Sequence, residues 1–327
     1  MAAIDPQMKE VLDALQKLDP KPIEQLEPKE ARQQPTPADA VKRVLEQRGQ
    51  STEPEAVAEV DDRKIDHADS TMPLVGKNPI RIYTPFGDGP FPILLYFHGG
   101  GFVIADLDVY DSTPRALANA ADCIVVSAHY RQGPEDPYPA AHEDALKAYD
   151  WAIENSEQIG GNGTIAIAGE SAGGNLACST SLRAKDAGMP LPVAQLLVYP
   201  IADGDSSKPA YSEHADAKPL STQMMEWFTK HYRPDANDPH FALTQANLSG
   251  LPPTTIVNAE IDPLRDDGPA LAEGLRAAGV DVEHRHFEGV THEFFGMGAV
   301  VDKAKQAVEF SACRLARNLQ AAGAKKV

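Results

Sequence analysis

The order of apolar and polar positions along the chain predicts strands that alternate with helices. Apolar runs of strand length occur at 57–65, 80–83, 92–97, 123–129, 164–168, 195–199, 254–259 and 282–287. Apolar residues at helical spacing occur at 8–18, 38–48, 139–155, 175–185 and 268–278. Strands and helices in alternation favour a mainly parallel sheet that is flanked by helices. We therefore predict an α/β fold.

Two segments lie outside this alternation. Residues 1–50 hold two helical patterns separated by a Pro- and Glu-rich stretch. Residues 200–251 are polar at first and then carry large apolar side chains at near-helical spacing, among them Met225, Trp227 and Phe228. Such a helix most often packs its apolar face on the domain below it. A length of 327 residues suits one domain with a smaller appendage, so we expect the main domain to comprise 51–199 and 252–327.

The sequence Gly-Glu-Ser-Ala-Gly at 169–173 lies between the strand 164–168 and the helix 175–185. A turn this tight strains its central residue, and glycines on either side remove side chains that would collide. The hydroxyl group of Ser171 is then held at a helix N-terminus, where the helix dipole favours developing negative charge. Gly-x-Ser-x-Gly alone occurs by chance in many chains, so its context matters. We interpret Ser171 as a nucleophile.

A second glycine-rich motif, His-Gly-Gly-Gly-Phe at 98–102, follows the strand 92–97. Glycines at this place bring backbone N–H groups close to a reacting carbonyl group. A serine nucleophile needs such donors for the oxyanion, and the loss of one donor typically costs about 3 kcal/mol of transition-state stabilisation. We expect the N–H groups of Gly100, Gly101 and Ala172 to form the oxyanion hole.

An acid and a histidine follow in chain order, each after a later strand. Asp262 follows the strand 254–259, and His292 follows the last strand. A neutral His292 would accept the proton of Ser171, while Asp262 would fix its tautomer. Asp266 and Asp267 are alternatives as loop carboxylates, with Asp267 a candidate N-cap of the helix 268–278. Position alone favours Asp262.

A metal site is the alternative use of the histidines. His284 and His286 fall on one face of a strand, with His292 and Glu293 nearby, and these are metal-ligand residue types. Strand histidines more often pack or face water. We expect no metal and no cofactor.

Charge and composition exclude some partners. Lys and Arg total 30 against 48 Asp and Glu, a net charge of −18, which repels nucleic acid and anionic lipid. No apolar run approaches the roughly 20 residues needed to span a bilayer. We expect Cys123, Cys178 and Cys313 to be reduced core residues in a cytoplasmic protein, although a removed signal peptide is compatible with the sequence. A homodimer is compatible as well.

With these motifs the chain resembles the hormone-sensitive lipase family of α/β-hydrolases, in its bacterial esterase branch. Further matching stretches lie at 130–135, 139–141, 251–253, 262–266 and 292–294. The resemblance implies a catalytic triad of Ser171, Asp262 and His292, the oxyanion donors Gly100 and Gly101, and hydrolysis of carboxylic esters. It also implies that 1–50 and 200–251 form a cap over Ser171.

The cap residues Met225, Trp227 and Phe228, together with Phe102, are then candidates for the substrate pocket. The chain departs from the family pattern in three places: Glu170 stands where Asp is more frequent, Gln132-Gly133 where Leu-Ala is usual, and Asp136 where His is common. We expect Glu170 and Glu135 to be buried, hydrogen-bonded supports of the two motifs, and the alternative is that they are only polar neighbours.

The expected substrate is a small-molecule ester with an acyl group of roughly two to six carbons, because a closed apolar pocket rewards added methylenes only while they find room. An amidase or a lactonase would use the same triad. A non-catalytic ligand receptor of the same fold is a further alternative, which the presence of His292 disfavours.

Overall fold

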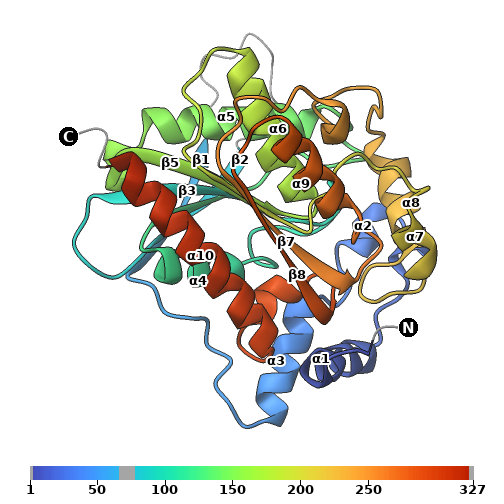
Figure 1. The fold of residues 1–327 in the computed structure, drawn as a ribbon. Helices are drawn as coiled ribbons and strands as arrows, with labels where there is room; N and C mark the ends of the chain where they lie inside the picture. The colour runs from blue at the N-terminus through green and yellow to red at the C-terminus, as the bar shows by residue number, and fades with distance from the viewer. Residues whose placement is uncertain (1–2, 66–77, 324–327) are drawn as a thin grey trace.

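The computed structural model describes residues 3–65 and 78–323 and centres on one twisted sheet (Figure 1). The strand order is β1-β2-β4-β3-β5-β6-β7-β8. The pairs β1–β2 and β2–β4 are antiparallel, and all later neighbours are parallel. The predicted α/β fold with a mainly parallel sheet is confirmed.

The strands and helices have the following bounds. The strands are β1 (Glu59–Ile65), β2 (Asn78–Thr84), β3 (Phe91–Phe97), β4 (Ile124–Ala128), β5 (Gly161–Glu170), β6 (Gln195–Val198), β7 (Thr254–Ile261) and β8 (Val282–Thr291). The α-helices are α1 (Pro6–Lys17), α2 (Pro28–Ala31), α3 (Pro37–Gln47), α4 (Ser112–Ala121), α5 (Ala140–Glu154), α6 (Ala172–Asp186), α7 (Pro209–Glu213), α8 (Thr222–Tyr232), α9 (Asp267–Ala277) and α10 (Asp302–Gly323).

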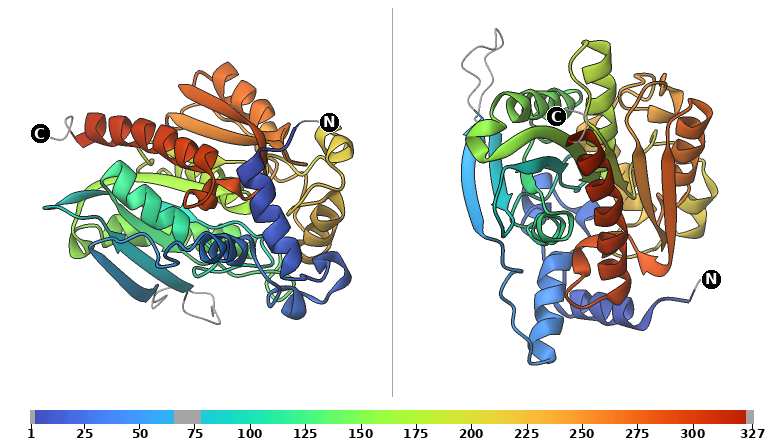
Figure 2. Two further views of the ribbon diagram at one scale, coloured as in Figure 1. Left: turned by 90° about the horizontal axis from the view of Figure 1, so that it is seen from below. Right: turned by 60° about the vertical axis from the view of Figure 1, so that its left-hand side comes forward.

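The central strands of the sheet are buried on both faces, whereas the edge strand β1 is largely exposed, and β3 shows why a central strand is apolar throughout. Ile93, Leu95 and Phe97 belong to the core under α5, α6 and α9. Leu94 and Tyr96 belong to the core under α4 and α10. Successive side chains of a strand point to opposite faces, so a strand covered on both sides needs apolar residues at every position. Figure 2 shows the helices on the two sides of the sheet.

The edge strand β8 is longer than the apolar pattern predicts. Its ladder with β7 continues to the pair Ile261 and Thr291, with an irregularity after Ala259. The segment 288–291, which lies beyond the apolar run 282–287, therefore belongs to the strand. His292 follows directly after β8, at the carboxyl edge of the sheet.

One expectation about the cysteines is wrong. Cys123 and Cys178 are buried, but Cys313 is exposed. The buried face of α10 includes Ala312 and Leu315, and Cys313 points away from it. Among the described residues, no helix is long and apolar enough to cross a membrane.

The two segments outside the alternation lie near the carboxyl ends of the parallel strands. Figures 1 and 2 show α1 and α3 side by side, close to the start of α10. Farther along, the indole N–H of Trp227 in α8 donates to the carbonyl oxygen of Leu26 over 3.1 Å. This bond ties the N-terminal segment to the segment between β6 and β7.

Candidate active site

Ser171 lies at the sharp turn between β5 and α6. Its backbone has φ 56° and ψ −117°, a strained conformation for a non-glycine residue. The turn depends on its two glycines. A Cβ on Gly169 would lie 2.0 Å from the carbonyl oxygen of Gly173, and a Cβ on Gly173 would lie 2.0 Å from that of Phe97. The predicted tight turn is therefore present, and Ser171 keeps 5% of its surface exposed.

The structure brings Ser171, His292 and Asp262 together. The Nε2 atom of His292 lies 2.9 Å from Oγ of Ser171, and Nδ1 lies 2.7 Å from Oδ2 of Asp262. The other carboxylate oxygen of Asp262 accepts from the N–H of Leu264 at 2.9 Å. Both Asp262 and His292 are buried. This chain of hydrogen bonds can carry the proton of Ser171 to the imidazole and fix the tautomer that accepts it.

The electrostatic setting of His292 is acidic. Burial lowers the pKa of the imidazole. The charge and hydrogen bond of Asp262, together with the charges of Glu293 and Glu170, raise this pKa by more than burial lowers it. The net result is a pKa above the ordinary value of 6.5. A protonated His292 cannot accept the proton of Ser171, so the site is competent only above this raised pKa.

Glu170 is buried behind the triad, as expected. Its carboxylate accepts a hydrogen bond from the hydroxyl group of Tyr96 at 2.6 Å and another from that of Tyr199. Burial raises the pKa of Glu170 to about 7 against the opposing effect of these bonds. Glu293 is held in a similar way by the hydroxyl group of Tyr110 at 2.5 Å. These tyrosines come from separate parts of the chain, so no local sequence pattern around Glu170 or Glu293 indicates them.

The expectation for Glu135 is wrong. Its side chain is 56% exposed and forms an ion pair with Arg32 of the N-terminal segment. The hydrogen bond from Arg32 is the main reason that the pKa of Glu135 lies below its ordinary value. Glu135 supports the loop that follows His98 only through Arg32, which donates to the carbonyl oxygen of Val103.

Gly100 and Gly101 line the same cavity as Ser171 and His292. Both have positive φ, 101° and 58°, and neither could carry a side chain in place. A Cβ on Gly101 would lie 2.2 Å from the ring of Phe228. Ala172 is the first residue of α6, so its N–H belongs to the unpaired donors of that helix N-terminus. These positions fit the predicted oxyanion hole.

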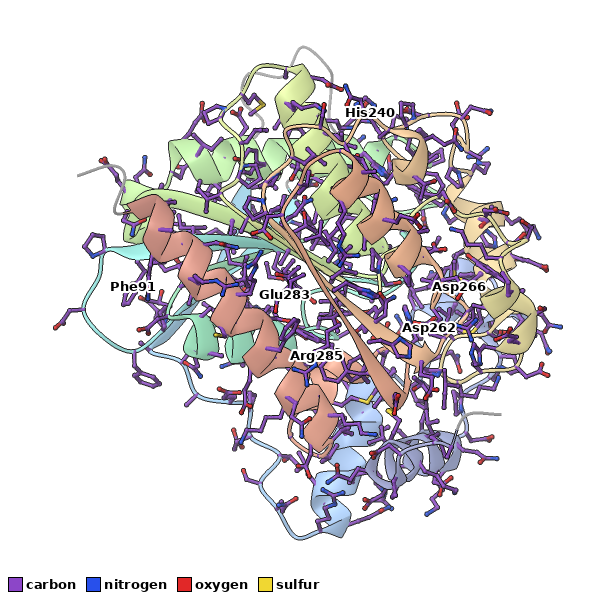
Figure 3. The ribbon with its side chains drawn as sticks, viewed as in Figure 1. Phe91, His240, Asp262, Asp266, Glu283 and Arg285 are labelled. Atoms are coloured by element: carbon purple, nitrogen blue, oxygen red, sulfur yellow. The ribbon has the colours of Figure 1, made fainter. Side chains whose placement is uncertain are left out.

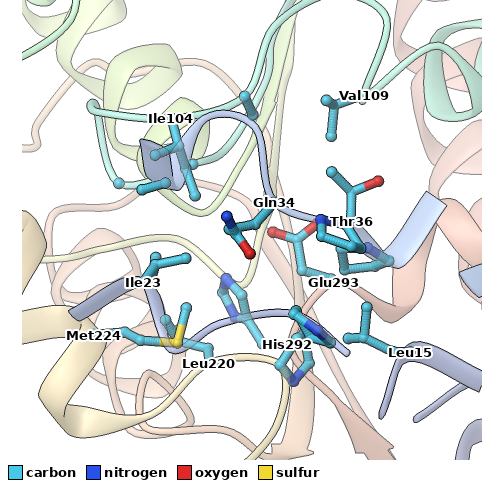
Figure 4. Close-up of a pocket in the computed structure, with 18 of the residues that line it drawn as sticks. Leu15, Ile23, Gln34, Thr36, Ile104, Val109, Leu220, Met224, His292 and Glu293 are labelled. Atoms are coloured by element: carbon cyan, nitrogen blue, oxygen red, sulfur yellow. The ribbon is translucent and has the colours of Figure 1, made fainter. Parts of the chain in front are cut away.

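The cavity above Ser171 has a volume of about 730 Å³ (Figure 4). Figure 4 shows His292 and Glu293 between a group of Ile23, Leu220 and Met224 and the side chain of Leu15. The N-terminal residues contribute a large share of the wall, with Leu12, Leu15, Ile23 and Ala31 as apolar examples. The apolar spacing of residues 8–18 predicted the helix but could not show that part of its face meets a cavity.

Two of the four predicted pocket residues are found at this cavity. Met225 and Phe228 line it, whereas Phe102 and Trp227 do not. The ring of Phe102 stacks on Tyr232 with 4.2 Å between centroids. Trp227 points its indole N–H to the N-terminal segment instead. A second cavity of about 360 Å³ shares Met225 and Phe228 with the first and includes Phe102 in its wall.

The alternative acids have other partners. Asp266 accepts from the N–H of Ala210 and from Arg265. Figure 3 shows Asp262 and Asp266 near the carboxyl end of β7. Asp267 does not cap α9 through its side chain, contrary to expectation. It is fully buried, and its carboxylate accepts from Lys208 at 2.6 Å and from the N–H of Ala202 at 2.9 Å.

The strand histidines do not form a metal site. Nε2 of His284 lies 3.0 Å from Oδ1 of Asn258. Within residues 3–65 and 78–323, no group of three or more His, Cys, Asp or Glu side chains could hold a metal ion. His292 is engaged with Ser171 and Asp262.

Comparisons with known proteins agree with this geometry. A family model described as alpha/beta hydrolase fold matches residues 94–296. The chain is 46% identical over 222 residues to esterase LipI of Mycobacterium tuberculosis, which covers 66% of this chain and 69% of the relative. It is 35% identical over 237 residues to ethyl acetate hydrolase of Pseudomonas putida, covering 70% and 74%.

Among solved structures, a hyperthermophilic esterase from the archaeon Pyrobaculum calidifontis is similar over nearly the whole length. The TM-score is 0.83 at 31% identity, and the match covers 96% of this chain and 98% of that one. The N-terminal segment and the segment between β6 and β7 therefore have counterparts in an esterase structure.

Proposed function

Because the chain belongs to the α/β hydrolase fold family, in its hormone-sensitive lipase branch, we propose that it is a serine carboxylesterase acting through Ser171, His292 and Asp262. The observation that carries the proposal is the continuous hydrogen-bond chain from Ser171 Oγ to His292 and on to Asp262. The names of the relatives, esterase and ethyl acetate hydrolase, support the same reaction class.

In the first step, Oγ of Ser171 attacks the ester carbonyl carbon while Nε2 of His292 takes the hydroxyl proton. Asp262 stabilises the imidazolium ion that forms. The carbonyl oxygen becomes an oxyanion, which the N–H groups of Gly100, Gly101 and Ala172 stabilise. The tetrahedral intermediate then collapses, the ester C–O bond breaks, and the alcohol leaves with the proton from His292.

In the second step, water replaces the alcohol. His292 accepts a proton from this water, and the resulting hydroxide attacks the acyl-enzyme carbonyl carbon. Collapse of the second intermediate breaks the bond to Ser171 and returns the proton to Oγ. The products are a carboxylic acid, an alcohol and the free enzyme, so atoms and charge balance with water as the only co-reactant.

The substrate class we propose is a dissolved ester with a short acyl group. Residues 12–37 and the helix α8 would act as a cap, because both contribute to the wall of the cavity above Ser171. The tie between Trp227 and Leu26 supports a cap that is closed over the site. A cavity of limited volume favours small acyl groups over long chains.

The proposal is tested with one panel of substrates. Purified protein is given p-nitrophenyl esters of increasing acyl length, matched anilides and lactones, each beside Ser171→Ala as the control. We expect rapid hydrolysis of short esters, slow or no hydrolysis of anilides, and no activity in the control. Faster hydrolysis of anilides or lactones than of esters would identify the protein as an amidase or a lactonase.

A further inference from the structure

Three successive carbonyl groups after the glycine motif are held by side chains from other parts of the chain. The carbonyl oxygen of Val103 accepts from Nε of Arg32 at 2.8 Å. Those of Ile104 and Ala105 accept from Nε2 of Gln132 at 2.8 and 3.0 Å. Arg32 belongs to the N-terminal segment, and Gln132 follows β4. Side chains from two segments that are distant in the sequence therefore donate hydrogen bonds to the loop 103–105.

This loop is in direct contact with the first oxyanion glycine. The N–H groups of Val103 and Ile104 donate to the carbonyl oxygen of Gly100 at 3.0 and 2.9 Å. A Cβ on Gly100 would lie 2.2 Å from the carbonyl oxygen of Ile104, the same atom that Gln132 holds. A shift of the Ile104 carbonyl group would therefore move Gly100, whose N–H we assign to the oxyanion hole.

Arg32 is fixed by more than this loop. Its Nη2 donates to the carbonyl oxygen of Gly133 at 2.8 Å, and its two terminal nitrogens form a bidentate pair with Glu135 at 2.8 and 2.7 Å. The N–H of Gly133 in turn donates to the carbonyl oxygen of Phe102 at 2.9 Å. The planar guanidinium group thus donates to three acceptor groups at once, two carbonyl groups and one carboxylate, which an ammonium group cannot reproduce with the same geometry.

We propose that Arg32 and Gln132 are positioning residues that hold the loop 100–105 in the conformation in which Gly100 and Gly101 bind the oxyanion. Because Arg32 belongs to the N-terminal segment, the position of this segment affects the rate of the chemical step as well as the entry of substrate. This inference rests on the proposed esterase function. Gln132 stands where the resembling family usually has Leu, a side chain that cannot donate a hydrogen bond. The hydrogen bonds from Gln132 to the loop are therefore a feature of this chain.

We expect kcat to fall when the hydrogen bonds of either Arg32 or Gln132 to the loop are removed. Arg32→Met and Gln132→Leu keep most of the side-chain volume but lose the hydrogen bonds to the loop. A displacement of the donors of the order of 1 Å can cost about 100-fold in rate, so we expect kcat to fall by about 10- to 100-fold in each variant. The KM for a small ester such as p-nitrophenyl acetate should change less than about threefold.

Trp227→Phe is the matched control. It removes a different hydrogen bond of the N-terminal segment, the one to Leu26, without touching the loop 100–105. If the segment acts only as a cover, Trp227→Phe and Arg32→Met will have similar effects on KM and neither will lower kcat. If Arg32 positions the donors, only Arg32→Met will lower kcat.

The deciding experiment measures kcat, KM and the inhibition constant of a trifluoromethyl ketone for the wild type, Arg32→Lys, Arg32→Met, Gln132→Leu and Trp227→Phe. The ketone forms a tetrahedral adduct with Ser171 and needs the same donors. We expect its inhibition constant to rise by the same factor as kcat/KM falls across the Arg32 and Gln132 series. Arg32→Lys provides a second variant if Arg32→Met does not fold.

Unchanged kcat and unchanged ketone affinity in folded Arg32 and Gln132 variants would overturn the inference. A wild-type protein without Ser171-dependent ester hydrolysis would instead overturn the proposed function.

Discussion

The ring of Tyr199 lies against the imidazole of His292, with 4.4 Å between the ring centroids. The hydroxyl group of the same tyrosine donates to Glu170. His292 is therefore connected through Tyr199 to the buried carboxyl group of Glu170, in addition to its direct hydrogen bond with Asp262. The charge and hydrogen bond of Asp262, with smaller contributions from Glu293 and Glu170, outweigh burial and raise the pKa of His292.

The pH dependence of the reaction follows from this setting. His292 must be neutral to act as a base, and its pKa is raised above 6.5. The rate should therefore be low where the imidazole is protonated and should rise with pH through a midpoint above 6.5. The measurement is kcat/KM for p-nitrophenyl butyrate from pH 5 to 9. A midpoint well below 6.5 would contradict the electrostatic account.

Glu293→Gln should move that midpoint. The substitution removes a negative charge that raises the pKa of His292, so the rising limb should shift to lower pH. Glu288→Gln, in the exposed part of β8, is the control and should leave the midpoint in place. Equal midpoints in the two variants would show that Glu293 does not act on His292.

The acid of the triad can be separated from its neighbours by two readouts. Asp262→Asn should lower kcat by about 10³- to 10⁴-fold with little change in thermal stability, because it disturbs the tautomer of His292. Asp267→Asn should lower thermal stability and leave kcat nearly unchanged. It weakens the buried contact with Lys208, costing about 1–3 kcal/mol of stability, and leaves the triad intact.

Activity and thermal unfolding are measured on both variants and on Asp266→Asn. A larger loss of kcat in Asp266→Asn or Asp267→Asn than in Asp262→Asn would show that the acid is assigned to the wrong residue.

The acyl-length preference should depend on Phe228, whose ring lies between two cavities. Phe228 lines both the 730 Å³ cavity and the 360 Å³ cavity, so Phe228→Ala should join them. Each methylene that finds new room gains about 0.8 kcal/mol, which moves the optimum to longer acyl chains. A series of p-nitrophenyl esters from acetate to laurate measures the shift.

Leu15→Ala is the control for cavity volume, because Leu15 lines the first cavity but not the second. It should change the profile less than Phe228→Ala does. An optimum that stays at short chains in folded Phe228→Ala would show that the second cavity does not accept the acyl group.

The fold and the proposed catalytic residues could be predicted from the sequence because local motifs carry them. The motif at 169–173 marks the tight turn at Ser171, although the collision that Gly173 avoids is with Phe97 of β3. The apolar strands place Asp262 and His292 at one edge of the sheet. Such information is written in short stretches of chain.

The pocket could not be predicted in the same way. Trp227 and Phe228 are neighbours on one apolar helix, yet only Phe228 reaches the cavity above Ser171. Helical spacing shows that a face is apolar but not which neighbour covers it. The partners of Glu170 and of Arg32 come from distant elements, so no local pattern announces them.

The most direct test of the account is the mass of the Ser171 peptide after the protein reacts with a fluorophosphonate ester, a reagent that phosphonylates activated serines. We expect one adduct per chain on the tryptic peptide that contains Ser171, with loss of esterase activity in proportion. Ser171→Ala should take up no label. An adduct on another residue, or full esterase activity in fully labelled protein, would contradict the assignment of Ser171 as the nucleophile.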